Sequence, residues 1–277
     1  IGGAEVIDFA GGTAVHINAG AAALVLVIVL GKRLGWPRMP MRPHNLTMVM
    51  LGAGLLWFGW FGFNAGSAYA ADGVAALAAT NTLVATCGGG LAWLLVERLR
   101  DGHATSLGAA SGIVAGLVAI TPACANVTPL VAVLIGAVAG VLCALAVTLK
   151  YRLGYDDSFD VVGVHLVGGL VGTLMLGFVA TDMFGDGASV GLFAGGGFSL
   201  LAVQAIAAGG VLIYSFVIAG IVALVLKAVM GIRVSAEDET SGVDLALHAE
   251  NAYDIVESGG GGAFAGIGKG SIDREDG

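Results

Sequence analysis

The chain has 277 residues, of which 57% are hydrophobic and 12% are charged, and its mean hydropathy is +0.92. Soluble domains carry about 25% charged residues, so this composition excludes an ordinary soluble enzyme. It also excludes disordered and nucleic-acid-binding proteins, which need polar or basic sequences. The net charge of −8 lies entirely in the tail, because residues 1–233 hold 10 basic and 10 acidic residues whereas residues 234–277 hold 2 and 10. We therefore expect an all-α membrane domain, residues 1–230, followed by an acidic cytoplasmic tail, residues 231–277.

Apolar stretches long enough to cross a bilayer core of about 30 Å recur along the chain. In chain order, the seven expected transmembrane helices are residues 9–31, 45–69, 74–96, 106–121, 128–149, 159–181 and 199–227. The fourth is the shortest. Of the 5 prolines, 4 lie between these spans and Pro129 stands at the start of the fifth, which suits uninterrupted helices. The glycine pairs Gly136/Gly140 and Gly168/Gly172, each four residues apart, predict close packing between helices.

The basic residues predict the orientation. Each of them follows the first, third, fifth or seventh span or lies in the tail: Lys32, Arg33, Arg38, Arg42, Arg98, Arg100, Lys150, Arg152, Lys227, Arg233, Lys269 and Arg274. Under the positive-inside rule the tail is cytoplasmic and residue 1 lies outside the cell, so we expect a multi-pass protein of the plasma membrane. No basic leader with a cleavage site precedes the first span, so we predict no signal peptide and expect the chain to begin inside a longer protein.

Two spans carry ionisable residues, which are costly at membrane depth and therefore mark candidate functional sites. Asp8 precedes His16 in the first span, and Asp160 precedes His165 in the sixth. The first span runs inward and the sixth outward, as in inverted repeats whose substrate site lies near the midplane. This predicts a pore site shared by the two histidines; the alternative is that each histidine bonds to a neighbouring helix. Each aspartate either caps free N–H groups at a helix start or binds a ligand.

The second span carries a third candidate element. Trp60, Phe63 and Ser67 are spaced i, i+3 and i+7, so they share one helix face. A hydroxyl above an aromatic ring can hold a small cation through a hydrogen bond and cation–π attraction. The alternative is an aromatic belt at the membrane interface.

Four segments together resemble the ammonium transporter (Amt/Mep/Rh) family, and its Amt type in particular. They are DFAGGTAVHINAG at 8–20, PHNLTMVMLGAGLLWFGWFGFNAGSA at 43–68, GLVAITPAC at 116–124 and DVVGVHLVGGLVG at 160–172, within a resemblance that covers residues 1–253. The resemblance implies an eleven-helix inverted-repeat transporter, of which this chain would be helices five to eleven. It implies a homotrimer with one pore per subunit, no enzymatic activity, and neither a cofactor nor a metal.

The resemblance also implies the substrate, ammonium or ammonia with methylammonium as an analogue, and the residues of its path. The matching positions are His16, His165, Phe63, Ser67, Trp60 and Thr121, with Asp8 and Asp160 in support. The histidines would be the twin pore histidines, Phe63 the inner phenylalanine of the external gate, and Ser67 the hydroxyl of the outer ammonium site. Trp60 and Thr121 would line the pathway.

The tail resembles the segment that couples neighbouring subunits of this family beneath the membrane and adjoins a docking site for PII-type signalling proteins. The matching residues are Gly231, Arg233, Gly242, Asp244, His248, Glu250 and Tyr253. Without the resemblance, the tail would be a solvated acidic extension. An ammonium sensor that signals through this tail stays open as an alternative to a transporter. A seven-helix retinal protein is disfavoured, because Lys227 lies at the end of the last span rather than deep inside it.

Overall fold

The computed structural model describes residues 3–39, 41–185 and 187–253. Over these residues it contains helices and no strand, so the predicted all-α membrane fold is confirmed. The chain divides into two compact units, Ile1–Ile232 and Arg233–Gly277. The last part of the expected tail, residues 254–277, lies outside the described residues.

Within the described residues, six helical segments are long and apolar enough to cross a membrane. They are Gly12–Leu30, Leu46–Ala68, Gly73–Asp101, Pro129–Leu153, Val162–Val179 and Ser199–Val229. A shorter apolar helix, α4 (Ser106–Ile120), occupies the fourth expected span. In chain order the six segments consist of η1 (Gly12–Ile17) with α1 (Asn18–Leu30), α2 (Leu46–Asn64) with η2 (Ala65–Ala68), α3 (Gly73–Asp101), α5 (Pro129–Ala146) with α6 (Leu149–Leu153), η3 (Val162–Leu166) with α7 (Val167–Val179), and α8 (Ser199–Val229). The short turn η4 (Leu192–Ala194) precedes α8.

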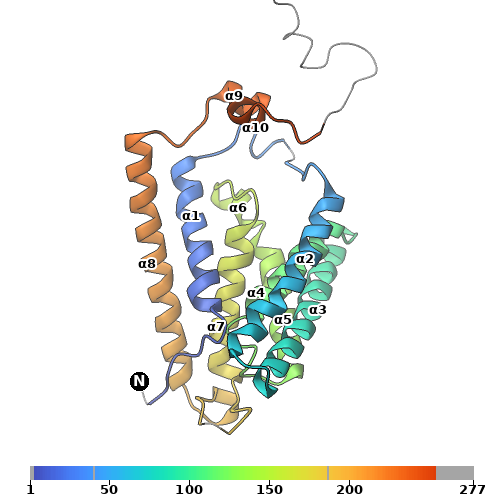
Figure 1. Cartoon of the computed structure of the whole chain (residues 1–277), viewed down its shortest axis with the longest axis vertical. Helices are drawn as coiled ribbons and strands as arrows, with labels where there is room; N and C mark the ends of the chain where they lie inside the picture. The colour runs from blue at the N-terminus through green and yellow to red at the C-terminus, as the bar shows by residue number, and fades with distance from the viewer. Residues whose placement is uncertain (1–2, 40, 186, 254–277) are drawn as a thin grey trace, which may run out of the picture. The chain divides into compact units, whose positions relative to one another are not determined.

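The apolar helices of this unit run alternately up and down in chain order (Figure 1). The carboxyl ends of α1, α3 and α8 therefore lie at the same end as the short helix α6. This end carries Lys32, Arg33, Arg98, Arg100, Lys150, Arg152 and Lys227, and we call it the basic end. The opposite end of the helices holds no Lys or Arg among the described residues. The basic residues, which the sequence places on one side of the membrane, thus lie at one end of the fold.

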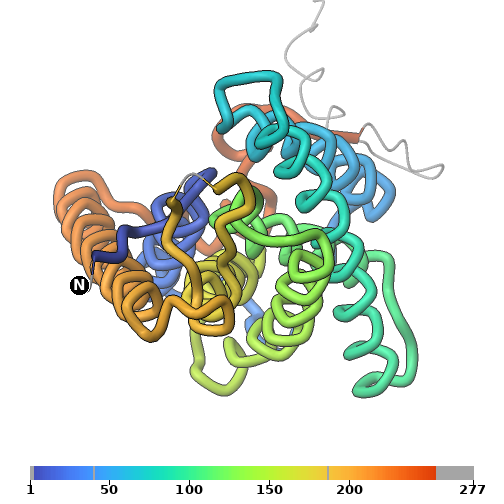
Figure 2. Tube along the Cα trace, turned by 90° about the horizontal axis from the view of Figure 1, so that it is seen from below, coloured from blue at the N-terminus to red at the C-terminus, as the bar shows by residue number. Residues whose placement is uncertain are grey.

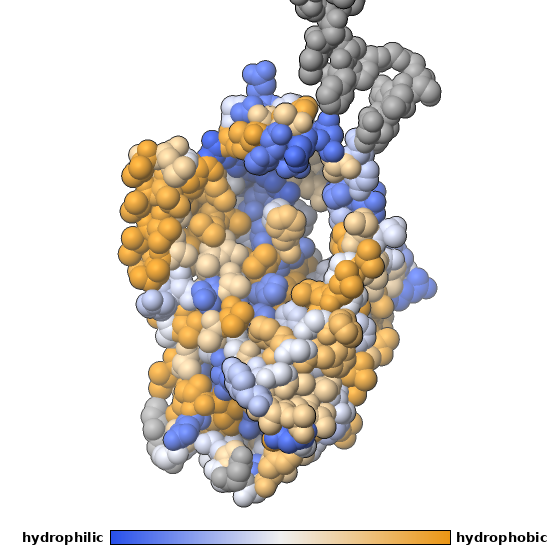
Figure 3. All heavy atoms as spheres, viewed as in Figure 1, coloured by the Kyte–Doolittle hydropathy of each residue, from blue (hydrophilic) through white to orange (hydrophobic). Residues whose placement is uncertain are grey.

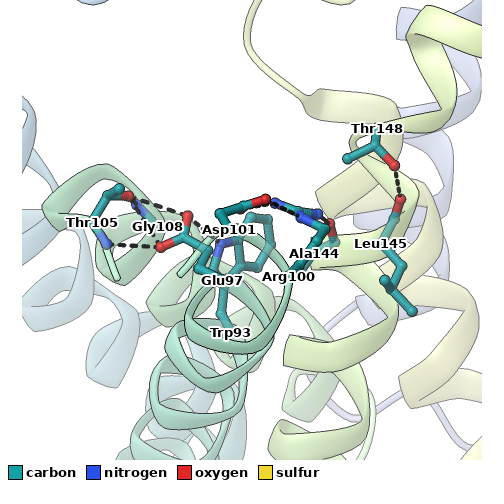
Figure 4. Close-up of polar contacts among 9 residues, drawn as sticks. All are labelled: Trp93, Glu97, Arg100, Asp101, Thr105, Gly108, Ala144, Leu145 and Thr148. Carbon is teal, nitrogen blue, oxygen red and sulfur yellow. Dashed lines mark hydrogen bonds and ion pairs between the residues drawn. The ribbon is translucent and has the colours of Figure 1, made fainter. Parts of the chain in front are cut away.

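A buried carboxylate fixes the turn between α3 and α4 (Figure 4). Glu97, near the end of α3, is 9% exposed and accepts hydrogen bonds from the backbone N–H of Thr105, at 2.8 Å, and from its hydroxyl, at 3.1 Å. The Thr105 hydroxyl oxygen in turn accepts the N–H of Gly108, at 2.8 Å, and so caps α4. Close by, Arg100 donates to the carbonyl of Ala144 in α5 at 3.0 Å. These contacts fix three consecutive spans to one another at the basic end.

Glycines bring the central helices into backbone contact. A Cβ atom added at Gly136 of α5 would lie 1.9 Å from the carbonyl oxygen of Ala85 in α3, and one at Gly140 would lie 2.3 Å from that of Gly89. A Cβ at Gly172 of α7 would lie 2.0 Å from the carbonyl oxygen of Ala119. The close packing predicted from the two glycine pairs is therefore confirmed. Figure 2, which looks along the helices, shows α3, α4 and α5 side by side.

Two of the spans are much less buried against the rest of the protein than the others. Only 11% of the most apolar window of Leu46–Ala68 and 17% of that of Ser199–Val229 is buried inside the structure, compared with 44–50% for Gly73–Asp101, Pro129–Leu153 and Val162–Val179. Hydrophobic side chains accordingly gather on the outer face of α8 (Figure 3). These faces suit contact with lipid or with further apolar helices.

Candidate functional site

The two membrane histidines face each other. His16 lies in η1 and His165 in η3, which are wide π-helical turns that continue into α1 and α7. Their Nδ1 atoms are 3.2 Å apart, and their ring centroids are 5.3 Å apart. The segments can approach so closely because Gly20 has no side chain. A Cβ atom at that position would lie 2.4 Å from Leu166. His16 is 4% exposed, and its Nε2 atom is buried without a partner in the described structure. The two sequence segments predicted to share a site are thus in direct contact.

A carboxylate caps the turn that carries His16. The oxygens of Asp8 accept hydrogen bonds from the backbone N–H groups of Thr13, at 2.9 Å, and Ala14, at 3.0 Å. These are N–H groups at the start of a helix, which have no partner within the helix. Of the two interpretations left open by the sequence, capping is therefore the one observed for Asp8.

The equivalent cap in the second segment comes from Asp157, not from Asp160. The Asp157 oxygens accept the N–H groups of residues 161 and 162 at 3.1 and 2.8 Å. Asp160 has a φ of 58°, and its carboxylate forms an ion pair with Lys150, N–O 2.5 Å. Asp157 precedes His165 by eight residues, the same spacing that separates Asp8 from His16. This spacing is the sequence signal that could have identified Asp157.

Aromatic rings cover one side of His16. The Trp60 ring stacks on it at 5.3 Å between centroids and 17° between planes, and the Phe63 ring lies at 6.2 Å. The Trp60 indole N–H donates to the Thr121 hydroxyl at 3.0 Å. Trp60 and Thr121 are both buried, whereas Phe63 is 40% exposed. With His165, five of the expected pathway residues therefore form one cluster, with Phe63 at its accessible edge.

Ser67 lies four residues beyond Phe63, at the edge of this cluster. It belongs to the 3₁₀ turn η2, which continues α2 beyond Phe63 toward the end opposite the basic end. Its hydroxyl donates to the Phe63 carbonyl oxygen at 2.8 Å. Because the hydroxyl hydrogen is used in this bond, the Ser67 oxygen is left to accept hydrogen bonds.

The segment before η1 pairs with the turn that follows α4. The N–H of Phe9 donates to the Pro122 carbonyl at 3.1 Å, and that of Ala10 donates to the Thr121 carbonyl at 3.2 Å. A Cβ at Gly12 would lie 2.1 Å from the Pro122 ring. The turn that holds the indole of Trp60 therefore also positions the entry into η1.

At the basic end, an ion pair joins the loop after α1 to the loop before η3. Arg33, just after α1, donates through Nε and a terminal nitrogen to Asp156, at 2.9 and 2.7 Å, in the loop before η3. Burial by itself raises the pKa of the Asp156 carboxyl, but the hydrogen bonds and charge of Arg33 outweigh it and hold the pKa below the usual value of 3.8. Asp156 is therefore ionised at neutral pH.

The second unit contains the helices α9 (Ala236–Ser241) and α10 (Val243–His248). Arg233 pairs with Glu239 at 2.5 Å, and Gly242, with a φ of 105°, separates the helices. Asp244, His248, Glu250 and Tyr253 are exposed, and Gly231 has a φ of 75°. Among the residues that the structure describes in both units, no group of three or more His, Cys, Asp or Glu side chains could hold a metal ion.

Residues 2–253 match the model of the Ammonium Transporter Family. The chain belongs to this family, and to its Amt type. It is 61% identical over 261 residues to an ammonium transporter of Mycobacterium tuberculosis, covering 92% of this chain and 55% of the relative. It is 43% identical over 254 residues to an ammonium transporter of Bacillus subtilis, covering 91% and 62%. The chain thus spans little more than half the length of these Ammonium Transporter Family members, which are named as transporters and not as enzymes.

Solved structures show the same likeness to the family. The crystal structure of Candida albicans Mep2 superimposes with a TM-score of 0.78 at 36% identity, covering 84% of this chain and 53% of that one. A structure described as a sensor Amt protein superimposes with a TM-score of 0.78 at 33% identity, covering 87% and 60%.

Proposed function

We propose that this chain is helices five to eleven of an ammonium transporter whose substrate path passes between His16 and His165. One observation carries the proposal: the two Nδ1 atoms lie 3.2 Å apart, although the histidines come from antiparallel segments 149 residues apart. The covering rings of Trp60 and Phe63 and the membership in the Ammonium Transporter Family support it.

Ser67 and Phe63 would recruit ammonium at the end opposite the basic end. An ammonium ion can only donate hydrogen bonds, and the Ser67 oxygen is left as an acceptor because its own hydrogen is bound to the Phe63 carbonyl. The partly exposed Phe63 ring would add cation–π attraction of about 0.5–2 kcal/mol. Asp8 would support this site indirectly, as the cap of the turn that carries His16.

The histidine pair would conduct ammonia through the apolar interior. Burying an isolated ammonium ion is prohibitive, whereas neutral ammonia passes at small cost, so potassium, which cannot lose a proton, would be rejected. Only one hydrogen can lie between the two Nδ1 atoms. When both rings are neutral, one Nε2 is therefore a donor and the other an acceptor, which gives ammonia a hydrogen-bonding path along the pair and a route for relaying its proton.

The whole protein would be a homotrimer in the plasma membrane, with one pore per subunit and lipid around it. The basic end would face the cytoplasm, so that residue 1 lies outside the cell and the tail inside. The exposed tail residues, including Asp244, His248 and Glu250, would then be accessible to neighbouring subunits or to a PII-type signalling protein. The apolar, little-covered faces of α2 and α8 support burial against further helices or lipid.

The test is methylammonium uptake by cells that express the full-length protein. We expect His16→Ala and His165→Ala each to lower uptake by about tenfold or more, or to admit potassium, because each variant breaks the hydrogen-bonding path. His103→Ala, in the exposed turn between α3 and α4, is the control and should leave uptake unchanged. Undiminished and equally selective uptake by both pore variants would contradict the proposal.

The likeness to a sensor Amt structure keeps a second function open, in which the same site binds ammonium and signals through the tail. The purified full-length protein in liposomes separates the two. A sensor would bind methylammonium without accumulating it, whereas the transporter that we propose would move it across the bilayer.

A further inference from the structure

Helix α8 carries a single amide side chain, and it is completely buried. Gln204 has 0% of its surface exposed. Its Oε1 accepts the backbone N–H of Ile7 at 2.9 Å, while its Nε2 donates to the Ile7 carbonyl at 2.7 Å and to the Thr173 carbonyl at 3.2 Å. One side-chain amide therefore pairs with both polar groups of Ile7 and also with a carbonyl of α7.

This pairing resembles the way two strands pair, but it joins a helix to a segment that has no secondary structure of its own. Residues 4–8, which lead into η1, are neither helix nor strand. Gln204 is fully buried, and a buried polar group without a partner costs about 1–3 kcal/mol. The half-buried Ile7 supplies two of the partners that this amide needs, and Gln204 in return binds both backbone polar groups of Ile7.

The contacts of Gln204 complete a closed ring of bonded residues that includes Asp8. Ile7 directly precedes Asp8, whose carboxylate accepts the N–H of Thr13 at 2.9 Å. The hydroxyls of Thr13 and Thr173 are 2.7 Å apart, and Thr173 is the residue whose carbonyl Gln204 also binds. The ring runs from Gln204 through Ile7, Asp8, Thr13 and Thr173 back to Gln204.

We propose that Gln204 is a positioning residue for the ammonium path. It fixes the peptide before Asp8, so that the Asp8 carboxylate stays in place to cap η1 and η1 stays in place to present His16. The inference rests on the proposed function and extends it to a residue of the last span that touches none of the predicted pathway residues in the described contacts. A side chain that only filled space would be replaced by leucine without effect on this segment.

The test uses the full-length protein with Gln204→Leu, which has nearly the same size but no hydrogen-bonding group. Gln204→Glu retains the acceptor oxygens and serves if the first variant does not fold. Ser215→Ala, a buried substitution on the same helix, is the matched control. Peptide-level hydrogen–deuterium exchange reports on residues 7–17, and the concentration dependence of methylammonium uptake gives KM and the maximal rate.

We expect exchange over residues 7–17 to accelerate about fivefold or more in both Gln204 variants and in Asp8→Asn, with the rest of the protein unchanged, because about 1 kcal/mol is lost per hydrogen bond. We expect the KM of the Gln204 variants to rise by a similar factor at a maximal rate within about twofold of wild type. Ser215→Ala should change neither.

Unchanged exchange over residues 7–17 in the Gln204 variants would overturn this inference, whatever the histidine variants do. Faster exchange with an unaltered KM would overturn it as well, because the hydrogen bonds of Gln204 would then have no bearing on the ammonium path. Normal uptake by the His16 and His165 variants, in contrast, would remove the proposed function and leave the exchange result standing.

Discussion

At the scale of single residues, the covering of His16 depends on one hydroxyl. Thr121 donates to the Leu117 carbonyl at 2.7 Å and accepts from the Trp60 indole at 3.0 Å, so both of its hydrogen-bonding roles are filled. Trp60 is 7% exposed and stacks on His16. Because nothing else in the described structure bonds to the indole N–H, Thr121 sets the orientation of the ring above the histidine.

Thr121→Val keeps the shape of this side chain and removes the hydroxyl, so we expect it to leave the Trp60 N–H buried without an acceptor. The loss should cost about 1–3 kcal/mol of stability and lower methylammonium uptake several-fold. Thr121→Ser retains the hydroxyl and should remain near wild type in both properties. Thermal unfolding in detergent and uptake in cells measure the two effects. Equal behaviour of the Val and Ser variants would show that the bond to Trp60 has no role.

At the scale of helices, backbone contact holds α3 and α5 together. Gly136 lies so near the Ala85 carbonyl that any side chain there would collide with backbone, which cannot rotate away. Gly90, a buried glycine of α3, differs from Gly136. A Cβ added to Gly90 would lie 3.7 Å from Ile113, an ordinary van der Waals distance. Comparing alanine substitutions at these two glycines therefore separates the effect of a steric clash between helices from the effect of losing a glycine.

We expect Gly136→Ala to force α3 and α5 apart and to destabilise the full-length protein by about 1–3 kcal/mol, as overpacked interiors do. Gly90→Ala should be neutral or slightly stabilising, since alanine favours the helix over glycine by about 1 kcal/mol. The midpoint of thermal unfolding in detergent distinguishes them. A midpoint for Gly136→Ala equal to that of Gly90→Ala would mean that the helices do not meet through this glycine.

The sequence was sufficient for features that depend on local patterns, and insufficient for those that depend on partners far along the chain. Hydropathy located the spans to within a few residues, except that α3 continues to Asp101 through a polar end. The opposed Asp–His segments predicted the contact between His16 and His165. The cap by Asp157 was missed because Asp160 stands nearer the helix, and only the structure shows that Lys150 binds Asp160. Gln204 gave no signal, because its partner Ile7 lies 197 residues away.

At the scale of the molecule in its membrane, charge divides the first unit into two ends. The basic end gathers residues from the ends of four helical segments, and the opposite end has no basic residue among those described. An anionic cytoplasmic leaflet attracts such a basic end at about 1 kcal/mol per residue. The proposed orientation in the membrane thus rests on this uneven distribution of basic residues, and not on any single contact. In that orientation, ammonium taken up by the cell would pass from Ser67 toward the end that carries Arg33.

Cysteine labelling of the full-length protein in intact cells tests this orientation. Tyr69, 96% exposed, lies at the end of η2 opposite the basic end, whereas Phe159, 87% exposed, lies in the loop before η3 at the basic end. With Cys87, the exposed cysteine among the described residues, replaced by alanine, a membrane-impermeant maleimide should label Tyr69→Cys in intact cells. Phe159→Cys should react only after the membrane is permeabilised, and the parent protein without either substitution gives the background. The reverse pattern would place the basic end outside the cell, and with it the Arg33–Asp156 ion pair, and would require ammonium to meet the histidine pair from the other side.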